Sequence, residues 1–127
     1  MRVMILVKAT QESENGFHPT PEMLAMMSAM DEYNEELRQA GIFVTADGLS
    51  PSAQGKRVKF DGPSRAVIDG PFPNVTDLVA GFWIWEVKDI DEAVAWVLRC
   101  PNPMPGPSAI EIRPFELLPD LPNNRAR

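Results

Sequence analysis

A strand-end carboxylate and a lone histidine have the clearest chemical potential in this sequence. Asp69 directly precedes Gly70 and Pro71. Its carboxylate either bonds the amides of its own turn or stands at the rim of a cleft as a general base or ligand anchor. His18 precedes a predicted helix N-terminus, where the dipole favours the neutral imidazole that a base requires. A solvated loop histidine is the alternative, and joint catalysis requires the fold to bring His18 and Asp69 together.

A second candidate is the carboxylate of Glu86, which lies inside an apolar strand on the same side as Phe82 and Ile84. This alternation predicts that Glu86 is buried, and a buried carboxylate needs either a partner or a raised pKa. Arg113, in the last predicted strand, is the expected partner. If the two do not pair, Glu86 is a candidate for a binding site.

Aromatic residues near these carboxylates are candidates for lining a site. Trp83 and Trp85 either pack in the core or an interface, or line a pocket, and Phe72 directly follows the Asp69 turn. Asp47 and Asp61 both precede glycine, so we expect them to form turns. Tyr33 and the neighbouring methionines are expected to pack a helix against the core.

Composition excludes several function classes. The 127 residues carry a net charge of −6, and the only basic cluster is Lys56-Arg57-Val58-Lys59, so neither nucleic acid nor an anionic membrane is an expected partner. One histidine and one cysteine, Cys100, cannot form the usual zinc site or an internal disulfide. We expect no metal and no cofactor, although a carboxylate-bound divalent ion stays open. The lack of an internal disulfide fits a reducing cytoplasm, and no signal peptide or membrane span is predicted.

Two helices are predicted from periodicity and capping residues. Thr20 and Pro21 start a helix over residues 21–40, whose apolar stripe includes four methionines, and Gly41 ends it. Asp89 starts a second helix that Pro101 ends. Residues 9–20 are predicted to form a loop.

Six strands are predicted around these helices, over residues 3–8, 42–46, 57–60, 66–69, 78–87 and 110–117. Two strand–helix–strand halves flank a hairpin. This order predicts an α+β fold with a ferredoxin-like antiparallel sheet and two helices on one face. We expect a single domain over residues 1–118 and a C-terminal tail over 119–127.

The strand over residues 78–87 is apolar on both sides, yet two helices cover only one face of a sheet. A bare apolar face is an aggregation hazard, so the second face needs a cover. A second copy of the chain, related by a two-fold axis, is the simplest cover. Loops 50–56 and 101–107 are the alternative.

Several blocks of the sequence resemble the YCII-related, or DGPF-domain, family. They are Asp69-Gly70-Pro71-Phe72 and residues 3–10, 40–49, 81–87 and 110–114. The resemblance implies a dimeric α+β barrel and small bacterial proteins, some of which have been proposed as enzymes with a His–Asp pair in a cleft. Of that His–Asp pair, only Asp69 lies in a motif that matches the family, and His18 matches no family motif. Relatives often continue with Ala-Glu-Thr-Lys, whereas this chain has Pro73-Asn74-Val75-Thr76.

Three functions are therefore compatible with the sequence. The first is a homodimeric small-molecule-binding protein with an aromatic cleft between sheet and partner, near the Asp69 turn. The second is an enzyme performing general acid/base chemistry on a small organic acid or lactone, with Asp69 as base and His18 or Arg113 assisting. The third is a structural or regulatory dimer module that binds no ligand.

Overall fold

A four-stranded antiparallel sheet forms the centre of the computed structural model, which describes residues 1–117. Its strands are β1 (Arg2–Lys8), β2 (Phe43–Gly48), β5 (Val79–Glu86) and β6 (Ile110–Pro114). Their order across the sheet is β2-β5-β1-β6, so the first and third of the four strands in chain order lie in the middle. This order confirms the predicted ferredoxin-like α+β fold.

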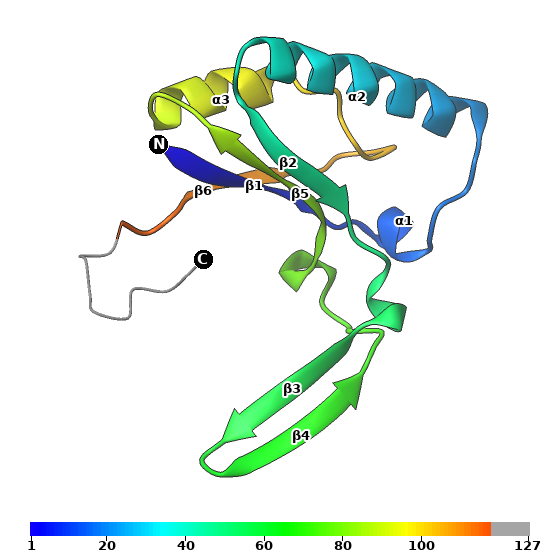
Figure 1. Cartoon of the computed structure of the whole chain (residues 1–127). Helices are drawn as coiled ribbons and strands as arrows, with labels where there is room; N and C mark the ends of the chain where they lie inside the picture. The colour runs from blue at the N-terminus through cyan, green and yellow to red at the C-terminus, as the bar shows by residue number, and fades with distance from the viewer. Residues whose placement is uncertain (118–127) are drawn as a thin grey trace.

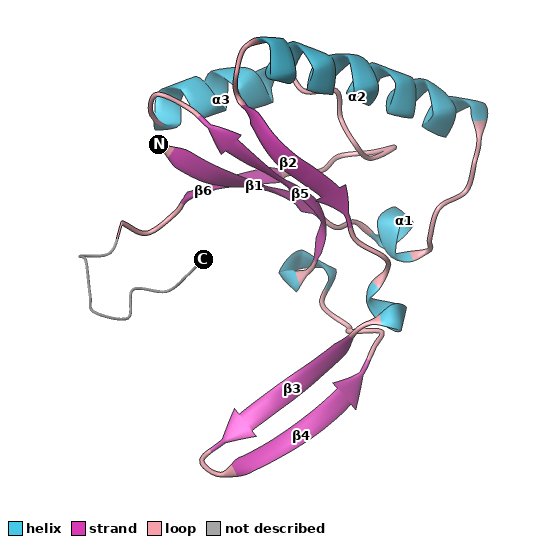
Figure 2. Cartoon of the chain, viewed as in Figure 1, coloured by secondary structure: helices cyan, strands magenta, loops and turns pink. Residues whose placement is uncertain are grey.

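Two helices, α2 (Pro21–Gln39) and α3 (Ile90–Leu98), lie on one face of the sheet, as the sequence predicts (Figure 2). The Thr20 side chain accepts a hydrogen bond from the Met23 amide at 3.1 Å, which satisfies one of the free amides of the first turn of α2. Gly41 ends that helix with φ of +75°, a conformation that favours glycine. The Asp89 carboxylate caps α3 by accepting from the Glu92 amide at 2.9 Å.

A third helix, the short α1 (Gln11–Glu14), interrupts the segment predicted as a loop. The Thr10 hydroxyl accepts from the Ser13 amide, and the Ser13 hydroxyl accepts from the Thr10 amide. These reciprocal hydrogen bonds stabilise one turn that has no apolar stripe, and so no periodic signal in the sequence.

The core lies between the helices and the facing side of the sheet. The sheet contributes Val3, Ile5, Val7, Trp83 and Trp85, the helices contribute Tyr33, Leu37 and Ala93, and Ile42 and Val87 lie next to strand ends. Alternation along β1 and β5 sends every second side chain to this side. As predicted, the side chains of residues 78–87 therefore alternate between the two faces of the sheet.

Two of the six predicted strands do not join this sheet. Strands β3 (Lys56–Asp61) and β4 (Ser64–Asp69) pair only with each other, in a hairpin that extends from the body on the side away from the helices (Figure 1). Gly62 makes the turn with φ of +57°. Short 3-10 turns, η1 (Ser52–Gln54) and η2 (Val75–Asp77), flank the hairpin on its two connections to the sheet.

The sheet face opposite the helices, which we call the open face, carries the half-buried residues Met4, Leu6, Phe82 and Ile84. Met4 pairs with Ile84 and Leu6 with Phe82 across β1 and β5. Loop 101–107 does not cover this face, because its residues Pro103 and Met104 line a cavity beside α2. A second copy as the cover stays a prediction.

The single-domain boundary at residue 118 also stays a prediction, and the tail expected over 119–127 lies outside the described residues. No helix within residues 1–117 has the length and apolarity required to cross a membrane.

Candidate functional site

A cavity of about 400 Å³ opens between the first half of α2 and the sheet. Methionines supply much of its wall: Met26, Met27 and Met30 come from α2, and Met104 comes from the loop before β6. The Trp83 ring from β5 also lines it. Unbranched thioether side chains are polarizable and change rotamer readily, so this wall can adapt to ligands of different shape.

Two glycines make room for the cavity. Gly48 of β2 pairs directly with Gly81 of β5, and both line the cavity. A Cβ atom added to Gly81 would lie 3.1 Å from the Asp47 carbonyl oxygen, whereas one added to Gly48 would meet no atom within 4 Å. Empty space therefore lies where strand side chains would otherwise fill the gap beneath α2.

The inner end of the cavity is held by polar and aromatic contacts. The Trp83 indole N–H donates to the Asn34 side-chain oxygen at 2.7 Å, which joins β5 to the middle of α2. Tyr33 packs edge-on against Trp83 with ring centroids 6.1 Å apart, and its hydroxyl donates to the Trp96 carbonyl. Burial raises the pKa of the Tyr33 phenol above its usual range, so Tyr33 stays protonated as this donor.

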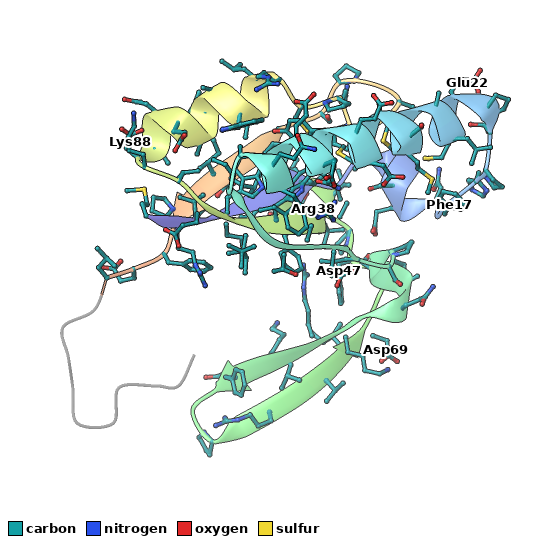
Figure 3. All side chains as sticks on the ribbon, turned by 45° about the horizontal axis from the view of Figure 1, so that its top comes forward. Phe17, Glu22, Arg38, Asp47, Asp69 and Lys88 are labelled. Atoms are coloured by element: carbon teal, nitrogen blue, oxygen red, sulfur yellow. The ribbon has the colours of Figure 1, made fainter. Side chains whose placement is uncertain are left out.

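Two acidic residues, Asp31 of α2 and Asp47 of β2, line the cavity and are solvent-exposed. Asp47 pairs with Phe82 across β2 and β5, so its carboxylate points to the opposite face of the sheet, and its carbonyl oxygen lies beside Gly81. Figure 3 shows Asp47 on the strand that leads from the sheet to the hairpin. Within residues 1–117 neither carboxylate forms a salt bridge, and no Lys, Arg or His lines the cavity. Asp47 was predicted to form a turn, but it lies inside β2, because the strand continues to Gly48.

The structure does not bring Asp69 and His18 together. The Asp69 carboxylate is 75% exposed at the end of β4, where it pairs with the Lys56 ammonium at 2.5 Å rather than with the amides of its own turn. The His18 ring contacts the Asn15 carbonyl oxygen at 3.2 Å. Phe17, the neighbour of His18, lies near the start of α2, away from Asp69 at the end of the hairpin (Figure 3).

The turn after Asp69 is instead bound to the body of the domain. The Ser52 hydroxyl donates to the Glu14 carboxylate and accepts from the Phe72 amide at 3.0 Å. The Ser52 amide also donates to Glu14, at 2.9 Å. A Cβ atom on Gly70 would lie 1.7 Å from the Ser52 carbonyl oxygen, so only glycine fits this approach. The Phe72 ring lies under the Arg57 guanidinium at 3.9 Å and lines no part of the cavity.

The predicted burial of Glu86 and its pairing with Arg113 are wrong. Glu86 is the last residue of β5, and this place at the end of the strand exposes it to solvent. It pairs with the N-terminal ammonium at 3.0 Å and with Arg2 at 3.4 Å. The ammonium hydrogen bond is the main reason that the Glu86 pKa is lowered. Arg113 pairs with Glu111 at 3.1 Å along its own strand.

The two tryptophans of β5 have different surroundings. Trp85 is fully buried in the core and lines no part of the cavity, and its indole N–H has no hydrogen-bond partner among residues 1–117. Trp83 combines both predicted roles, because it is buried and also lines the cavity. Nowhere in residues 1–117 do three or more His, Cys, Asp or Glu side chains gather into a group that could hold a metal ion.

Comparison with known proteins identifies the family. The YCII-related domain matches residues 1–116. This chain belongs to the YCII-related family. A search of curated proteins found no match. Among solved structures, the chain is similar to 5-chloro-2-hydroxyhydroquinone dehydrochlorinase (TftG) from Burkholderia phenoliruptrix AC1100, in complex with 2,5-dihydroxybenzoquinone. The TM-score is 0.51 at 18% identity, over 91% of this chain and 94% of the other. This likeness supports the fold assignment.

Apart from Trp83, the residues that line the cavity could not be predicted from the sequence, for a physical reason. A methionine stripe at helical spacing has the same pattern whether it packs on a core or lines a void. The one available signal was the high frequency of methionine in the first half of this helix, where four of the eight residues from Met23 to Met30 are methionine. Methionine-rich surfaces are typical of adaptable binding sites.

Proposed function

We propose that this YCII-related protein binds a small, largely apolar molecule in the cavity between α2 and β5. The observation that carries the proposal is the methionine- and tryptophan-lined void of about 400 Å³, whose size lies within the range of ligand pockets. Because this space is open to solvent, its apolar lining stays in contact with water, which costs free energy in proportion to the exposed apolar area. A bound ligand would remove that area from water.

The charges of the lining favour one class of ligand. The Asp31 carboxylate can accept hydrogen bonds from hydroxyl or amino groups, and no cation of the lining offsets its charge. A neutral or positively charged molecule with such donors is therefore favoured, and an organic acid is disfavoured by like-charge repulsion. The TftG structure contains 2,5-dihydroxybenzoquinone, a ring compound with two hydroxyl groups. This complex supports the proposed size of the ligand but not its chemical identity.

This proposal places the ligand on the helix side of the sheet rather than in a cleft at the Asp69 turn. An acid/base enzyme that uses Asp69 with His18 or Arg113 is not favoured, since each side chain contacts a different partner. A proton-transfer reaction in this protein would instead have to use a cavity carboxylate. The cytoplasmic location expected from the lone cysteine stays part of the proposal.

We also propose that the protein is a homodimer formed through the open face. The half-buried side chains of Met4, Leu6, Phe82 and Ile84 form a continuous apolar surface across β1 and β5. An isologous two-fold contact would cover this surface on both copies. Light scattering at micromolar concentration tests this proposal: we expect the mass of two chains, and a monomer mass would refute it.

Methyl-labelled methionine provides a direct test of ligand binding, because the seven methionines include their own reference signals. Three matched probes share a phenyl ring and a two-carbon chain: 2-phenylethanol, 2-phenylethylamine and phenylacetate. We expect the alcohol and the amine to shift the methyl signals of Met26, Met27, Met30 and Met104, while Met4 on the open face stays unchanged. Phenylacetate should bind at least tenfold more weakly.

A pair of substitutions on α2 provides the control. Met27 lines the cavity and Leu24 does not, although both are substantially exposed on the same helix, at 43% and 54%. Met27→Trp should fill the cavity mouth and abolish the methyl shifts, whereas Leu24→Trp should leave them intact. Binding that survives Met27→Trp, or shifts of Met4 alone, would place the ligand elsewhere and refute the proposed site.

A further inference from the structure

The β3–β4 hairpin, which we call the arm, is built like an interaction surface. All twelve residues of its two strands are solvent-exposed, and the arm extends from the domain below the sheet (Figure 1). A two-stranded hairpin is marginally stable in water without packing against other structure. The arm therefore gains stability from whatever covers it.

One side of the arm carries three large apolar side chains, Val58, Phe60 and Val67. Pairing places Val58 opposite Val67 and Phe60 opposite Arg65, and directly opposed residues share a side. Phe60 is 71% exposed, Val67 65% and Val58 48%. The Arg65 guanidinium lies 4.5 Å from the centre of the Phe60 ring and covers part of it. Exposed large apolar side chains gathered in this way indicate a protein contact.

Charge distinguishes the arm from the rest of the chain. Residues 55–70 hold four of the 12 Lys and Arg residues but only two of the 18 Asp and Glu residues, so the arm carries +2 and the remainder −8. The surface that complements the arm is thus acidic. The open face of this same chain carries such groups, because Asp47 pairs with Phe82 and Glu111 pairs with Leu6, which places both acidic side chains on that side of the sheet.

We propose that the arm is an interaction surface for a second copy of this chain. The Val58–Phe60–Val67 side would be buried against the partner, and the cations of the arm would face the partner's acidic body. This inference rests on the proposed homodimer. It assigns the arm a role in that dimer, because the arm extends on the same side of the sheet as the open face (Figure 1). Two-fold symmetry then gives two arms, each contacting the other copy.

Sedimentation of purified full-length protein tests this role, with the dimer dissociation constant as the readout. Phe60→Ser with Val67→Ser should raise that constant at least tenfold, because a buried aromatic residue commonly dominates an interface. Arg65→Glu, which changes the cation beside Phe60, should weaken the dimer and reduce its dependence on salt. Leu98→Ser is the matched control: Leu98 is 81% exposed on α3, on the helix side of the sheet, and its loss should leave the constant unchanged.

The outcomes separate this inference from the dimer proposal. If Leu6→Ser on the open face dissociates the dimer while the arm variants do not, the open face alone forms the dimer and the arm inference is overturned. A wild-type monomer would overturn both proposals. Circular dichroism should show an unchanged fold for the arm variants, since their side chains do not contribute to the core.

Discussion

A valine at position 48 should stabilise this protein and prevent it from binding its ligand. Gly48 lies in β2 without a positive φ, so the backbone accepts any side chain. An added Cβ meets no atom within 4 Å, and the side chain would extend into the cavity. The substitution therefore tests whether the void is kept for binding at the expense of stability.

The magnitude follows from two gains and one loss. Glycine inside a strand costs about 0.5–1 kcal/mol relative to alanine, because the unfolded chain loses more freedom on folding. Full burial of a valine side chain contributes about 1.5–3 kcal/mol, of which we take roughly half because the cavity is open to solvent. Ordering the side chain costs about 0.5 kcal/mol. The net gain is about 1 kcal/mol or slightly more, which corresponds to about 4 °C in Tm for a domain of this size.

Urea unfolding of Gly48→Val and Gly48→Ala, each with 2-phenylethanol titration, separates these contributions. We expect an increased midpoint and an unchanged m-value for both variants. Alanine should recover only the backbone gain and keep the probe-induced methyl shifts, whereas valine should abolish them. A valine variant that is destabilised, or that binds like wild type, would show that the space beside Gly48 is not the ligand site.

Three further predictions concern the turn and the core. Ser52→Ala should lower the free energy of unfolding by about 1–2 kcal/mol, measured by denaturant unfolding. A double-mutant cycle with Glu14→Gln should give a coupling energy of at least about 0.5 kcal/mol. Additive effects of the two substitutions would show that Ser52 and Glu14 do not stabilise the turn together. Asp69→Asn should change stability by less than about 1 kcal/mol, because its pair with Lys56 is exposed, and calorimetry should find probe binding unaltered. Burial raises the pKa of the Cys100 thiol from 9.0 to about 11, so the native protein at pH 8 should react with iodoacetamide roughly a hundredfold more slowly than the unfolded chain. Its rate should rise with pH up to that pKa, and equal native and denatured rates would contradict this environment.

Capping residues and apolar periodicity predicted most helices and strands, whereas the arrangement of the strands depends on packing between distant parts of the chain. Thr20, Gly41 and Asp89 act within one turn of their own helix, so their roles could be inferred from spacing alone. The separation of β3 and β4 from the main sheet could not, because a hairpin pattern specifies only which two strands pair with each other. Helix α1 was missed because its stability comes from side-chain caps rather than from an apolar stripe.

The candidate site was harder to predict than the fold, because the type of a residue did not indicate whether its side chain is buried, exposed or next to the cavity. Asp47 followed by Gly48 has the pattern of a turn, yet Gly48 pairs with Gly81 across two strands and leaves a void. Glu86 had the alternation of a buried residue, but its place at the end of β5 exposes it. Only the three-dimensional register of the sheet distinguishes these cases.

The two halves of α2 perform different tasks, and this division explains how a two-layer domain holds a cavity. In the second half, Tyr33 and Leu37 are buried against the sheet and keep the helix in place. In the first half, the methionines lie over paired glycines. Because the Asn34–Trp83 hydrogen bond also joins the second half of α2 to the sheet, the methionine side chains of the first half can repack without disturbing the core. The proposed binding would therefore require rotamer changes rather than movement of α2.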